Sequence, residues 1–271
     1  MNAFLIRRNT LSHEELGALL NADPASAANA ILSAARTGST QAQTLLGQIL
    51  LNGQGITQDQ ELARQWFKIA IQNSDDPAAH NMLGRCLEHG WGGEQDHSAA
   101  AAHYRRAIAA GLDWAMYNYA GLLATGRGVP RDDCQAYALY LRAAEAGHAK
   151  SMNLVGRYHE EGITVPRNPA LARKWYKRSA EAGDFRGQFS YAAVLAEDRQ
   201  LEQAQHWLLE ALRTGNLNFL RFGRASLSLA DSTAVRAIAL AYYARAAEIG
   251  DETDKQALEE HIAGQPQQIN T

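Results

Sequence analysis

The sequence predicts an all-α protein made of repeated pairs of helices. Three observations lead to this: a similar segment recurs about every 36 residues, each copy holds two stretches with helical spacing of apolar residues, and glycines separate the two stretches. The copies align on a column of small residues, Gly47, Gly84, Ala120 and Gly156. The residues that close the copies, Ser74, Gly111, Gly147 and Gly183, are separated by 37, 36 and 36 residues.

The first stretch of each copy predicts an amphipathic helix, which we call helix A. In the first copy Ala42, Leu46 and Leu50 are spaced four apart and therefore share one helix face. The small residue after the large one, such as Gly47, leaves room for a second helix to approach closely. Because a glycine within a helix costs about 1 kcal/mol relative to alanine, close packing is the expected reason for it.

A pair of glycines follows helix A in three of the copies. Glycine most readily takes the left-handed conformation that ends a helix, so Gly90 and Gly92, for example, predict a helix end and a turn. The alternative for Gly-x-Gly is a phosphate-binding loop, but no third glycine and no Gly-Lys-Ser/Thr follows. The fourth copy has Gly162-Ile163-Thr164 instead, and we expect a different turn there.

An N-capping residue opens the second helix of each copy, helix B, four positions after the second loop column. The caps are Asp59, Asp96, Asp132 and Asn168. Their side-chain oxygens can accept from free backbone N–H groups, which stabilises a helix by about 1 kcal/mol. In helix B one aromatic residue stands between small ones. These aromatic residues are Phe67, Tyr104, Tyr140 and Tyr176. We expect the rings to fill the crossing of the two helices, as core and not as cofactor contacts.

The repeats continue more weakly on both sides of these four copies. Upstream, Ser12 to Glu15 fits a capping box. The expected divisions are an N-terminal segment at 1–11, helical repeats over 12–250 with the best match at 42–183, a polar capping helix at 251–263, and a disordered tail at 264–271. The repeats then amount to about seven helix pairs.

The combined pattern, Ala…Leu-Gly…Gly-x-Gly-Val…Asp…Ala…Trp-Tyr…Ala-Ala…Gly, resembles the Sel-one-like repeat (SLR) family, relatives of the tetratricopeptide repeats. The resemblance implies a right-handed α-solenoid, a superhelix of antiparallel helix pairs. It also implies a non-enzymatic scaffold or adaptor that binds other proteins. Secreted relatives with a disulfide in each repeat are not matched, because the only cysteines, Cys86 and Cys134, fall at non-equivalent positions.

Composition narrows the partners and the compartment. The formal charge is −3, from 26 basic and 29 acidic residues with mixed signs, so we expect no nucleic-acid partner. The apolar run from Ala3 to Ile6 is too short for a secretory signal, and no stretch approaches the ~18 apolar residues of a membrane helix. We therefore expect a cytoplasmic protein with no membrane partner, whose two cysteines are reduced, partly buried thiols.

The face of helix A that points away from helix B is the expected binding surface, because it lines the concave wall of such a solenoid. We hypothesise that Asn and Arg side chains hold an extended or acidic peptide there, while aromatic rings stack on its side chains. An Asn amide matches a peptide unit and an Arg fork matches a carboxylate. The candidate residues are Asn81, Arg85, Trp114, Tyr117, Lys150, Asn153, Arg157, Arg186 and Phe189.

Three alternatives stay open at this point. The candidate residues could be only solvated, or could pair locally with Glu88 and Glu160. The same groove could bind a small ligand or a cell-wall fragment, which would need a deep apolar pocket. A metal-dependent hydrolase would need ligands, and one segment is rich in them: Cys86, Glu88, His89, Asp96, His97 and His103. Their spacing matches no metal motif, and no nucleophile motif occurs, so we expect neither enzyme activity nor a cofactor.

Overall fold

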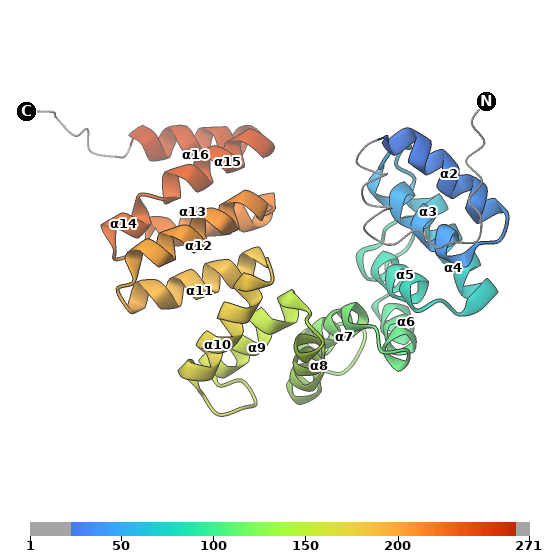
Figure 1. Ribbon diagram of the computed structural model, residues 1–271, viewed down its shortest axis with the longest axis horizontal. Coiled ribbons are helices and arrows are strands. Elements are labelled where there is room, and N and C mark those ends of the chain that lie inside the picture. The colour runs from blue at the N-terminus through green and yellow to red at the C-terminus, as the bar shows by residue number, and fades with distance from the viewer. Residues whose placement is uncertain (1–22, 264–271) are drawn as a thin grey trace, which may run out of the picture. The chain divides into compact units, whose positions relative to one another are not determined.

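The computed structural model describes residues 23–263, and every regular element in that range is an α-helix, as the repeats predict (Figure 1). The expected N-terminal segment at 1–11, the capping box at Ser12 to Glu15 and the tail at 264–271 lie outside the described residues. The chain divides into two compact units, one up to Leu139 and one from Tyr140, which we call unit 1 and unit 2. The expected stretch of repeats at 12–250 is therefore described here as two units.

The helices follow one another as helix A and helix B with short connections. Those of unit 1 are α2 (Pro24–Arg36), α3 (Thr40–Asn52), α4 (Gln60–Ser74), α5 (Pro77–His89), α6 (His97–Ala109) and α7 (Asp113–Thr125). The division between the units falls within α8 (Asp133–Glu145). Those of unit 2 are α9 (Ala149–Glu161), α10 (Pro169–Glu181), α11 (Phe185–Glu197), α12 (Leu201–Thr214), α13 (Leu217–Ser228), α14 (Thr233–Arg236), α15 (Ala239–Ile249) and α16 (Glu252–Ala263). Packed pairs of helix A and helix B are α3/α4, α5/α6, α9/α10, α11/α12 and α13/α15.

The predicted N-caps open the B helices. Asp59, Asp96 and Asp132 each accept a hydrogen bond at 2.9 Å from the backbone N–H three residues on, and Asn168 does so at 3.0 Å. Each bond satisfies one of the donors that a helix start leaves without an intrahelical partner. The prediction of these four caps is confirmed.

The small-residue column of helix A lies against the aromatic residue of helix B. A Cβ atom added to Gly84 would lie 2.6 Å from the Tyr104 ring, and one added to Gly156 would lie 2.5 Å from the Tyr176 ring. These rings are almost fully buried, as expected for core residues. Gly223 repeats the same contact against a tyrosine of α15. The missing side chain thus lets the two helices of a pair cross closely.

The turn after helix A keeps the same left-handed backbone in the fourth copy as in the others, so the expectation of a different turn there is wrong for the backbone conformation. Thr164 has a φ of +60°, close to the +68° of Gly92 and the +70° of Gly128. The glycine column also has a second purpose, because a Cβ on Gly92 would lie 2.1 Å from the carbonyl oxygen of Gln60, at the start of the preceding B helix. Thr164 therefore carries backbone strain that glycine would avoid.

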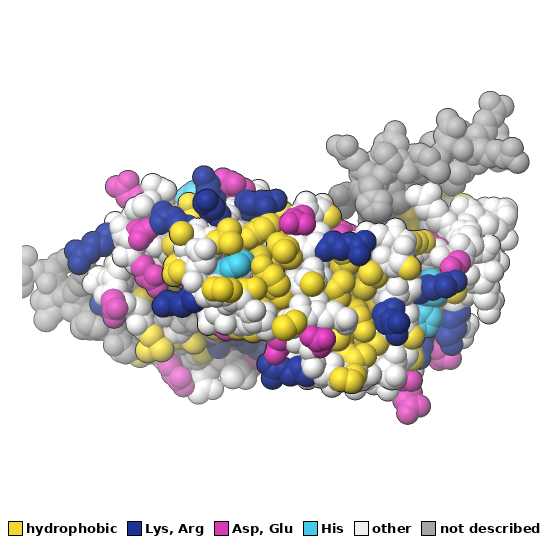
Figure 2. Space-filling model, turned by 90° about the horizontal axis from the view of Figure 1, so that it is seen from below, with side chains coloured by type: hydrophobic (Ala, Val, Ile, Leu, Met, Phe, Trp, Pro, Cys, Tyr) yellow, Lys and Arg dark blue, Asp and Glu magenta, His cyan; other side chains and the backbone are white. Residues whose placement is uncertain are grey.

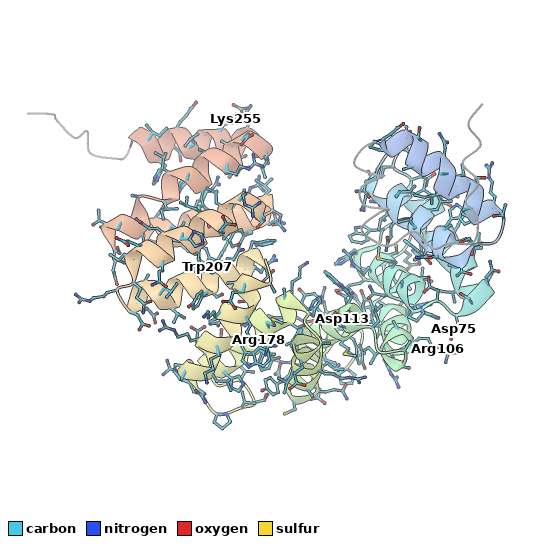
Figure 3. The ribbon with its side chains drawn as sticks, in the orientation of Figure 1. Asp75, Arg106, Asp113, Arg178, Trp207 and Lys255 are labelled. Atoms are coloured by element: carbon cyan, nitrogen blue, oxygen red, sulfur yellow. The ribbon has the colours of Figure 1, made fainter. Side chains whose placement is uncertain are left out.

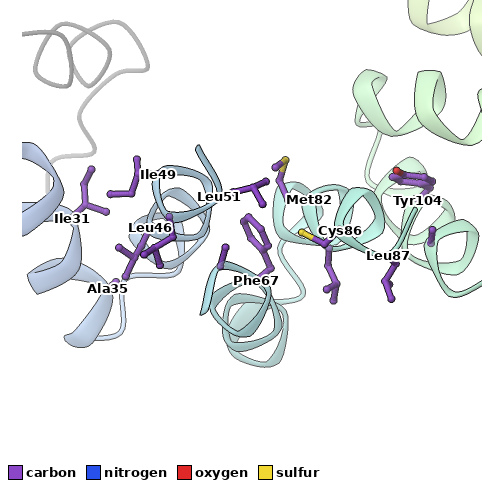
Figure 4. Close-up of a cluster of buried hydrophobic side chains, with 14 of the residues drawn as sticks. Ile31, Ala35, Leu46, Ile49, Leu51, Phe67, Met82, Cys86, Leu87 and Tyr104 are labelled. Atoms are coloured by element: carbon purple, nitrogen blue, oxygen red, sulfur yellow. The ribbon is translucent and has the colours of Figure 1, made fainter. Parts of the chain in front are cut away.

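Each unit has its own hydrophobic core. The core of unit 1 runs through the helix pairs from Ala28 to Leu122 and includes Phe67 and Tyr104 (Figure 4). The core of unit 2 runs from Ala172 to Ala246. Cys86 is buried in the first of these cores, whereas Cys134 is exposed at the start of α8 rather than partly buried as expected; both are free thiols. Burial raises the pKa of the Cys86 thiol to about 11, which makes it unreactive at neutral pH.

The last described helix, α16, forms where the sequence predicts a final polar helix and is held by an ion-pair cluster. Asp254 is fully buried and accepts from Arg221 Nε at 2.9 Å and from Arg224 Nη1 at 2.9 Å. Asp251 pairs with the same Arg221. The two arginines belong to α13, so this cluster fixes α16 beside the last helix pair. Hydrogen bonds from Arg221 hold the pKa of the Asp254 carboxyl at about 2.

Candidate functional site

The nine candidate residues lie on helices of the A type, divided between the two units. Unit 1 carries Asn81 and Arg85 on α5 and Trp114 and Tyr117 on α7. Those of unit 2 are Lys150, Asn153 and Arg157 on α9, and Arg186 and Phe189 on α11. Because the two units are not placed relative to each other, each set is described by itself.

Asn81 is buried, where the pattern predicts an exposed side chain. Only 7% of its surface is accessible. Its Oδ1 accepts a hydrogen bond at 2.9 Å from Nδ2 of Asn118, on the next A helix. The Asn81 amide therefore joins α5 to α7, and this contact uses a group that the sequence assigned to a peptide.

Arg85 is half-buried and contacts the loop that follows its own helix. Its guanidinium carbon lies 5.0 Å from the centre of the Trp91 ring, and the other neighbour of this ring is His89, whose ring centre is 4.6 Å away. Arg85 does not pair with Glu88, whose carboxylate accepts from Tyr104 at 2.7 Å and from Arg127 at 3.0 Å. Glu88 therefore contributes to packing between helices and is not the local partner of Arg85.

Trp114 and Tyr117 lie on α7. Trp114 exposes 46% of its surface, the largest exposure among the tryptophans of the described residues, and Tyr117 is half-buried. An exposed indole is costly in water and is a common anchor for a partner protein. These two side chains are the part of the unit 1 set that best matches the sequence expectation.

Of the three candidates on α9, Arg157 is exposed, and Lys150 and Asn153 are half-buried. Arg157 is exposed and forms an ion pair with Glu161 at 3.7 Å, one helical turn on, rather than with Glu160. Glu160 instead accepts from Tyr176 at 2.6 Å. The Oδ1 atom of Asn153 is buried, and within residues 23–263 no group donates a hydrogen bond to it.

The candidates on α11 are joined by an aromatic cluster that sequence reasoning did not find. Phe189 is half-buried, and its ring centre lies 5.6 Å from Phe219 and 5.8 Å from Phe222 on α13. Phe222 is 60% exposed. Arg186, at the start of α11, stacks on the neighbouring Phe185 ring at 4.7 Å. The cluster thus combines an exposed phenylalanine with an exposed cation on adjacent A helices.

The sequence gives a reason why Phe222 is easily missed. It directly precedes Gly223, and the residues before the matching glycines, such as Leu46 and Leu83, are buried. In α13 the flanking Arg221 and Arg224 turn toward Asp254 of α16, and Phe222 is left at the surface. The repeat pattern alone therefore predicts a core residue at this position.

The two best-formed cavities of the described residues lie in unit 1, and none of the nine candidate residues lines either of them. One of about 460 Å³ lies at the start of α6, between Arg64, Asp96, His97 and Gly128. The other, of about 380 Å³, is shallow and lies between Ile108, Tyr119 and Leu139. Neither is the deep apolar pocket in the groove that a small-ligand binder would need.

The ligand-rich segment considered for a metal is spread over separate structural roles. Cys86 lies in the core, His89 stacks on Trp91, and Asp96 caps α6. Across residues 23–263, no three His, Cys, Asp or Glu side chains gather as a metal-binding group. No helix in the same range is both long and apolar enough to cross a bilayer. Figure 2 shows one face of the molecule, on which positive and negative side chains are interspersed with apolar ones.

Comparisons with known proteins agree with the repeat architecture. A family model described as Sel1 repeat matches residues 40–75, 77–112, 115–148, 149–184 and 230–251. The crystal structure of a Sel1 repeat protein from Oxalobacter formigenes is similar, with 25% identity over 92% of this chain and 98% of that one, at a TM-score of 0.68. No curated protein matches the sequence.

Two further solved structures are similar in fold alone. One is c5321, a protective antigen of uropathogenic Escherichia coli strains with an SLR fold: 24% identity, 91% of this chain, 55% of that chain, TM-score 0.59. The other is the immunity protein Pa5087 from Pseudomonas aeruginosa: 12% identity, 82% of this chain, 80% of that chain, TM-score 0.53. Sel1 repeats are generally non-catalytic scaffolds for protein interaction. Since the matched repeats cover more than half of its length, the chain belongs to the Sel1 repeat family and has that family's fold, a solenoid of paired α-helices.

Proposed function

We propose that the chain is a non-enzymatic scaffold that binds an extended, acidic segment of another protein on the surface of its A helices. The main contact is the surface of α9, α11 and α13 in unit 2, which we call the α9–α13 surface. The observation that carries the proposal is the exposed ring of Phe222 on α13 beside Phe189 on α11. Arg186 lies on α11 as well, and Arg157 is exposed on α9.

The apolar part of this surface supports a protein partner. A phenylalanine that is 60% exposed costs free energy in water, and here it continues into a ring cluster that is fixed by Phe219 and Tyr242. Rigid aromatic side chains lose little conformational entropy on binding and often dominate the affinity of an interface. One aromatic or aliphatic side chain of the partner would cover Phe222.

The charged part of the surface favours an acidic partner. Lys150, Arg157 and Arg186 are the charged candidates on α9 and α11, and all three are cations. The ion pair of Arg157 with Glu161 joins two side chains that are each 52% exposed, so it contributes little to stability. Arg157 can therefore exchange this partner for a carboxylate of the bound segment at small cost.

The buried Oδ1 atom of Asn153 supports a backbone contact. A buried acceptor without a donor costs about 1–3 kcal/mol, and an N–H group of an extended segment would remove that cost after a small rotation of the amide. Asn81, at the equivalent position of unit 1, already has its partner in Asn118. In unit 1 we therefore assign the contact to Trp114, Tyr117 and Arg85, in a supporting role.

A site-specific crosslinking experiment tests the proposal. A photoreactive phenylalanine analogue replaces Phe222 in one protein and Leu209 in the other; Leu209 is also exposed, at 50%, but lies on a B helix. Both proteins are irradiated in lysate from the native host, and the attached peptides are identified by mass spectrometry. We expect one acidic segment attached at position 222 and absent at position 209.

The crosslink must also depend on the neighbouring cation. Arg157→Glu in the crosslinking protein should reduce the yield at position 222 about tenfold or more, because it reverses the charge that faces the segment. Lys177→Glu, on the helix B of the same pair, is the matched control and should leave the yield unchanged. Equal labelling from positions 222 and 209, or a yield that Arg157→Glu leaves intact, would reject the α9–α13 surface.

A further inference from the structure

A pair of histidines joins the second repeat of unit 1 to the end of the first. Nδ1 of His80, on α5, lies 2.8 Å from Nδ1 of His103, on α6. Nε2 of His80 lies 2.8 Å from Oδ1 of Asp75, the residue that ends α4. Asp75 also pairs with Arg106 of α6 at 3.0 Å, and Figure 3 shows these two side chains next to each other. One connected chain of side chains thus links α4, α5 and α6.

This arrangement accepts only one proton between the two Nδ1 atoms. A hydrogen bond between two imidazole nitrogens needs one N–H and one bare nitrogen. His80 donates from Nε2 to the Asp75 carboxylate, so its Nδ1 either accepts from His103 or, if His80 is charged, donates to it. When both rings carry both protons, two N–H groups face each other at hydrogen-bond distance and repel.

The surroundings oppose a second positive charge. His80 is 7% exposed and His103 is half-buried. Burial lowers the pKa of His103 below its ordinary value of 6.5, and the nearby charges of His80, Arg64 and Lys68 lower it further. The anions at this junction are Asp75, which has two partners already, and Asp76, which accepts from Thr44. No charged residue occurs in α3, and α7 has only Asp113, at its first residue.

We propose that the His80–His103 pair is a proton-sensitive junction that holds α4, α5 and α6 together near neutral pH and loosens them when both rings become charged. The folded state disfavours protonation of His103, so the folded protein binds fewer protons than the unfolded chain. The contribution of neutral His103 to stability is therefore complete above the unfolded-chain pKa of 6.5 and is lost as the pH falls below that value. Because α5 also carries Asn81 and Arg85, the same event loosens the A-helix surface of unit 1.

Hydrogen exchange of the full chain tests the junction. Amide exchange in peptides of α5 and α6 is measured from about pH 8 to about pH 5 and corrected for the intrinsic exchange rate. In the wild type we expect the local opening constant to rise below pH about 6.5, by up to about tenfold per pH unit. His103→Gln keeps a donor and an acceptor but does not titrate, and it should remove this rise.

A second histidine serves as the matched control. His206 is exposed on α12 of unit 2, and His206→Gln should leave the rise in α5 and α6 as in the wild type. An equal rise in His103→Gln, or no rise in the wild type, would overturn the proposal.

A spectroscopic measurement on the wild type keeps the test valid if His103→Gln fails to fold. The imidazole nitrogens are observed by long-range ¹H–¹⁵N correlation near neutral pH. We expect one of the two Nδ1 atoms to be protonated and the other bare, and His103 to titrate below 6.5. Two protonated Nδ1 atoms near neutral pH, or a His103 midpoint at or above 6.5, would show that no such junction exists.

Discussion

Asn81 of unit 1 and Asn153 of unit 2 occupy the same position of the repeat, two residues after the start of the helix A pattern, yet their surroundings differ. Asn81 accepts a hydrogen bond from Asn118, which lies 37 residues on. The residue 37 positions after Asn153 is Ser190, and none of the described groups donates to the Asn153 Oδ1 atom. A repeated residue type therefore does not imply a repeated role, because the next repeat decides whether its polar atoms are satisfied.

The two units differ in the same sense over a larger surface. In unit 1, Arg85 lies over Trp91 and Asn81 is paired, so the polar candidates of α5 contact their own chain. In unit 2, Phe222 remains exposed at the end of a ring cluster. The polar candidates of α5 thus serve packing within unit 1, whereas the exposed ring of unit 2 belongs to the α9–α13 surface that we propose for the partner.

The largest expected effect on the free energy of unfolding comes from the ion pairs between α13 and α16. Asp254→Ala leaves Arg224, of which 14% of the side chain is exposed, without its buried partner. Loss of one partner of a buried pair costs about 3–5 kcal/mol, and we expect about 2–3 kcal/mol here because Arg221 is about one-third exposed. Urea unfolding measures this loss of stability. Hydrogen exchange should increase in unit 2 and stay unchanged in α5 and α6.

The matched control is Asp251→Ala, because this carboxylate is 63% exposed and its loss should cost clearly less than the loss of Asp254. The pH dependence gives a further check. The Asp254 carboxyl has its pKa lowered from 3.8 to about 2, so its contribution is complete above the first value and disappears as the pH falls to the second. Equal losses in the two variants would contradict the assignment of the anchor to Asp254.

Turns that close helix B should behave alike in both units, in contrast to the A-helix surface. Gly111 and Gly147 have φ values of +85° and +101°, and a Cβ added to either would meet nothing within 4 Å. Gly111→Val and Gly147→Val should therefore each cost about 1–2 kcal/mol through backbone strain alone. Thermal unfolding measures both, and the corresponding Asn variants should cost less because Asn tolerates this conformation. A wild-type melting temperature for either Val variant would refute the strained turn.

The repeat pattern was sufficient to predict the fold, because the pattern and the packing have the same physical cause. Glycine against a buried ring and Asp at a helix start recur wherever two helices cross, so Gly84 with Tyr104 could be read from spacing. The family model leaves residues 185–229 unmatched, yet α11, α12 and α13 form there, as the weaker apolar pattern predicts.

The candidate site was less predictable, because burial at one position depends on neighbours in other repeats. Asn81 is buried and bonded to Asn118 of the next A helix, and Phe222 is exposed beside Arg221, which pairs with Asp254 further along the chain. Spacing within a single repeat contains neither fact. The histidine pair was missed for the same reason, because His80 and His103 belong to different helices and no repeated column predicts their contact.

A smaller effect is expected where unit 2 departs from the glycine column. Thr164 adopts a φ of +60°, in a region that costs a β-branched residue about 1–2 kcal/mol. Thr164→Gly removes this strain but adds about 0.5–1 kcal/mol of chain entropy to the unfolded state, so we expect a net stabilisation of about 0.5–1 kcal/mol. Urea unfolding measures the change, and Thr125→Gly, at the last residue of α7, should destabilise instead. A destabilised Thr164→Gly protein would mean that the Thr164 side chain contributes more than its backbone costs.

The last pair of variants gives the most direct comparison of the units. Asn81→Ala removes the acceptor of Asn118 and should cost about 1 kcal/mol, whereas Asn153→Ala removes a buried acceptor that has no donor and should leave stability unchanged or raise it. Partner capture should respond in the opposite order, because only Asn153 has an oxygen to offer to a bound segment. Urea unfolding and the crosslinking yield at position 222 measure the two responses on the same pair of proteins. If both variants lose the same stability and capture the same amount of partner, the contrast between the two asparagines has no functional meaning. The A helices of both units would then contribute equally to partner binding.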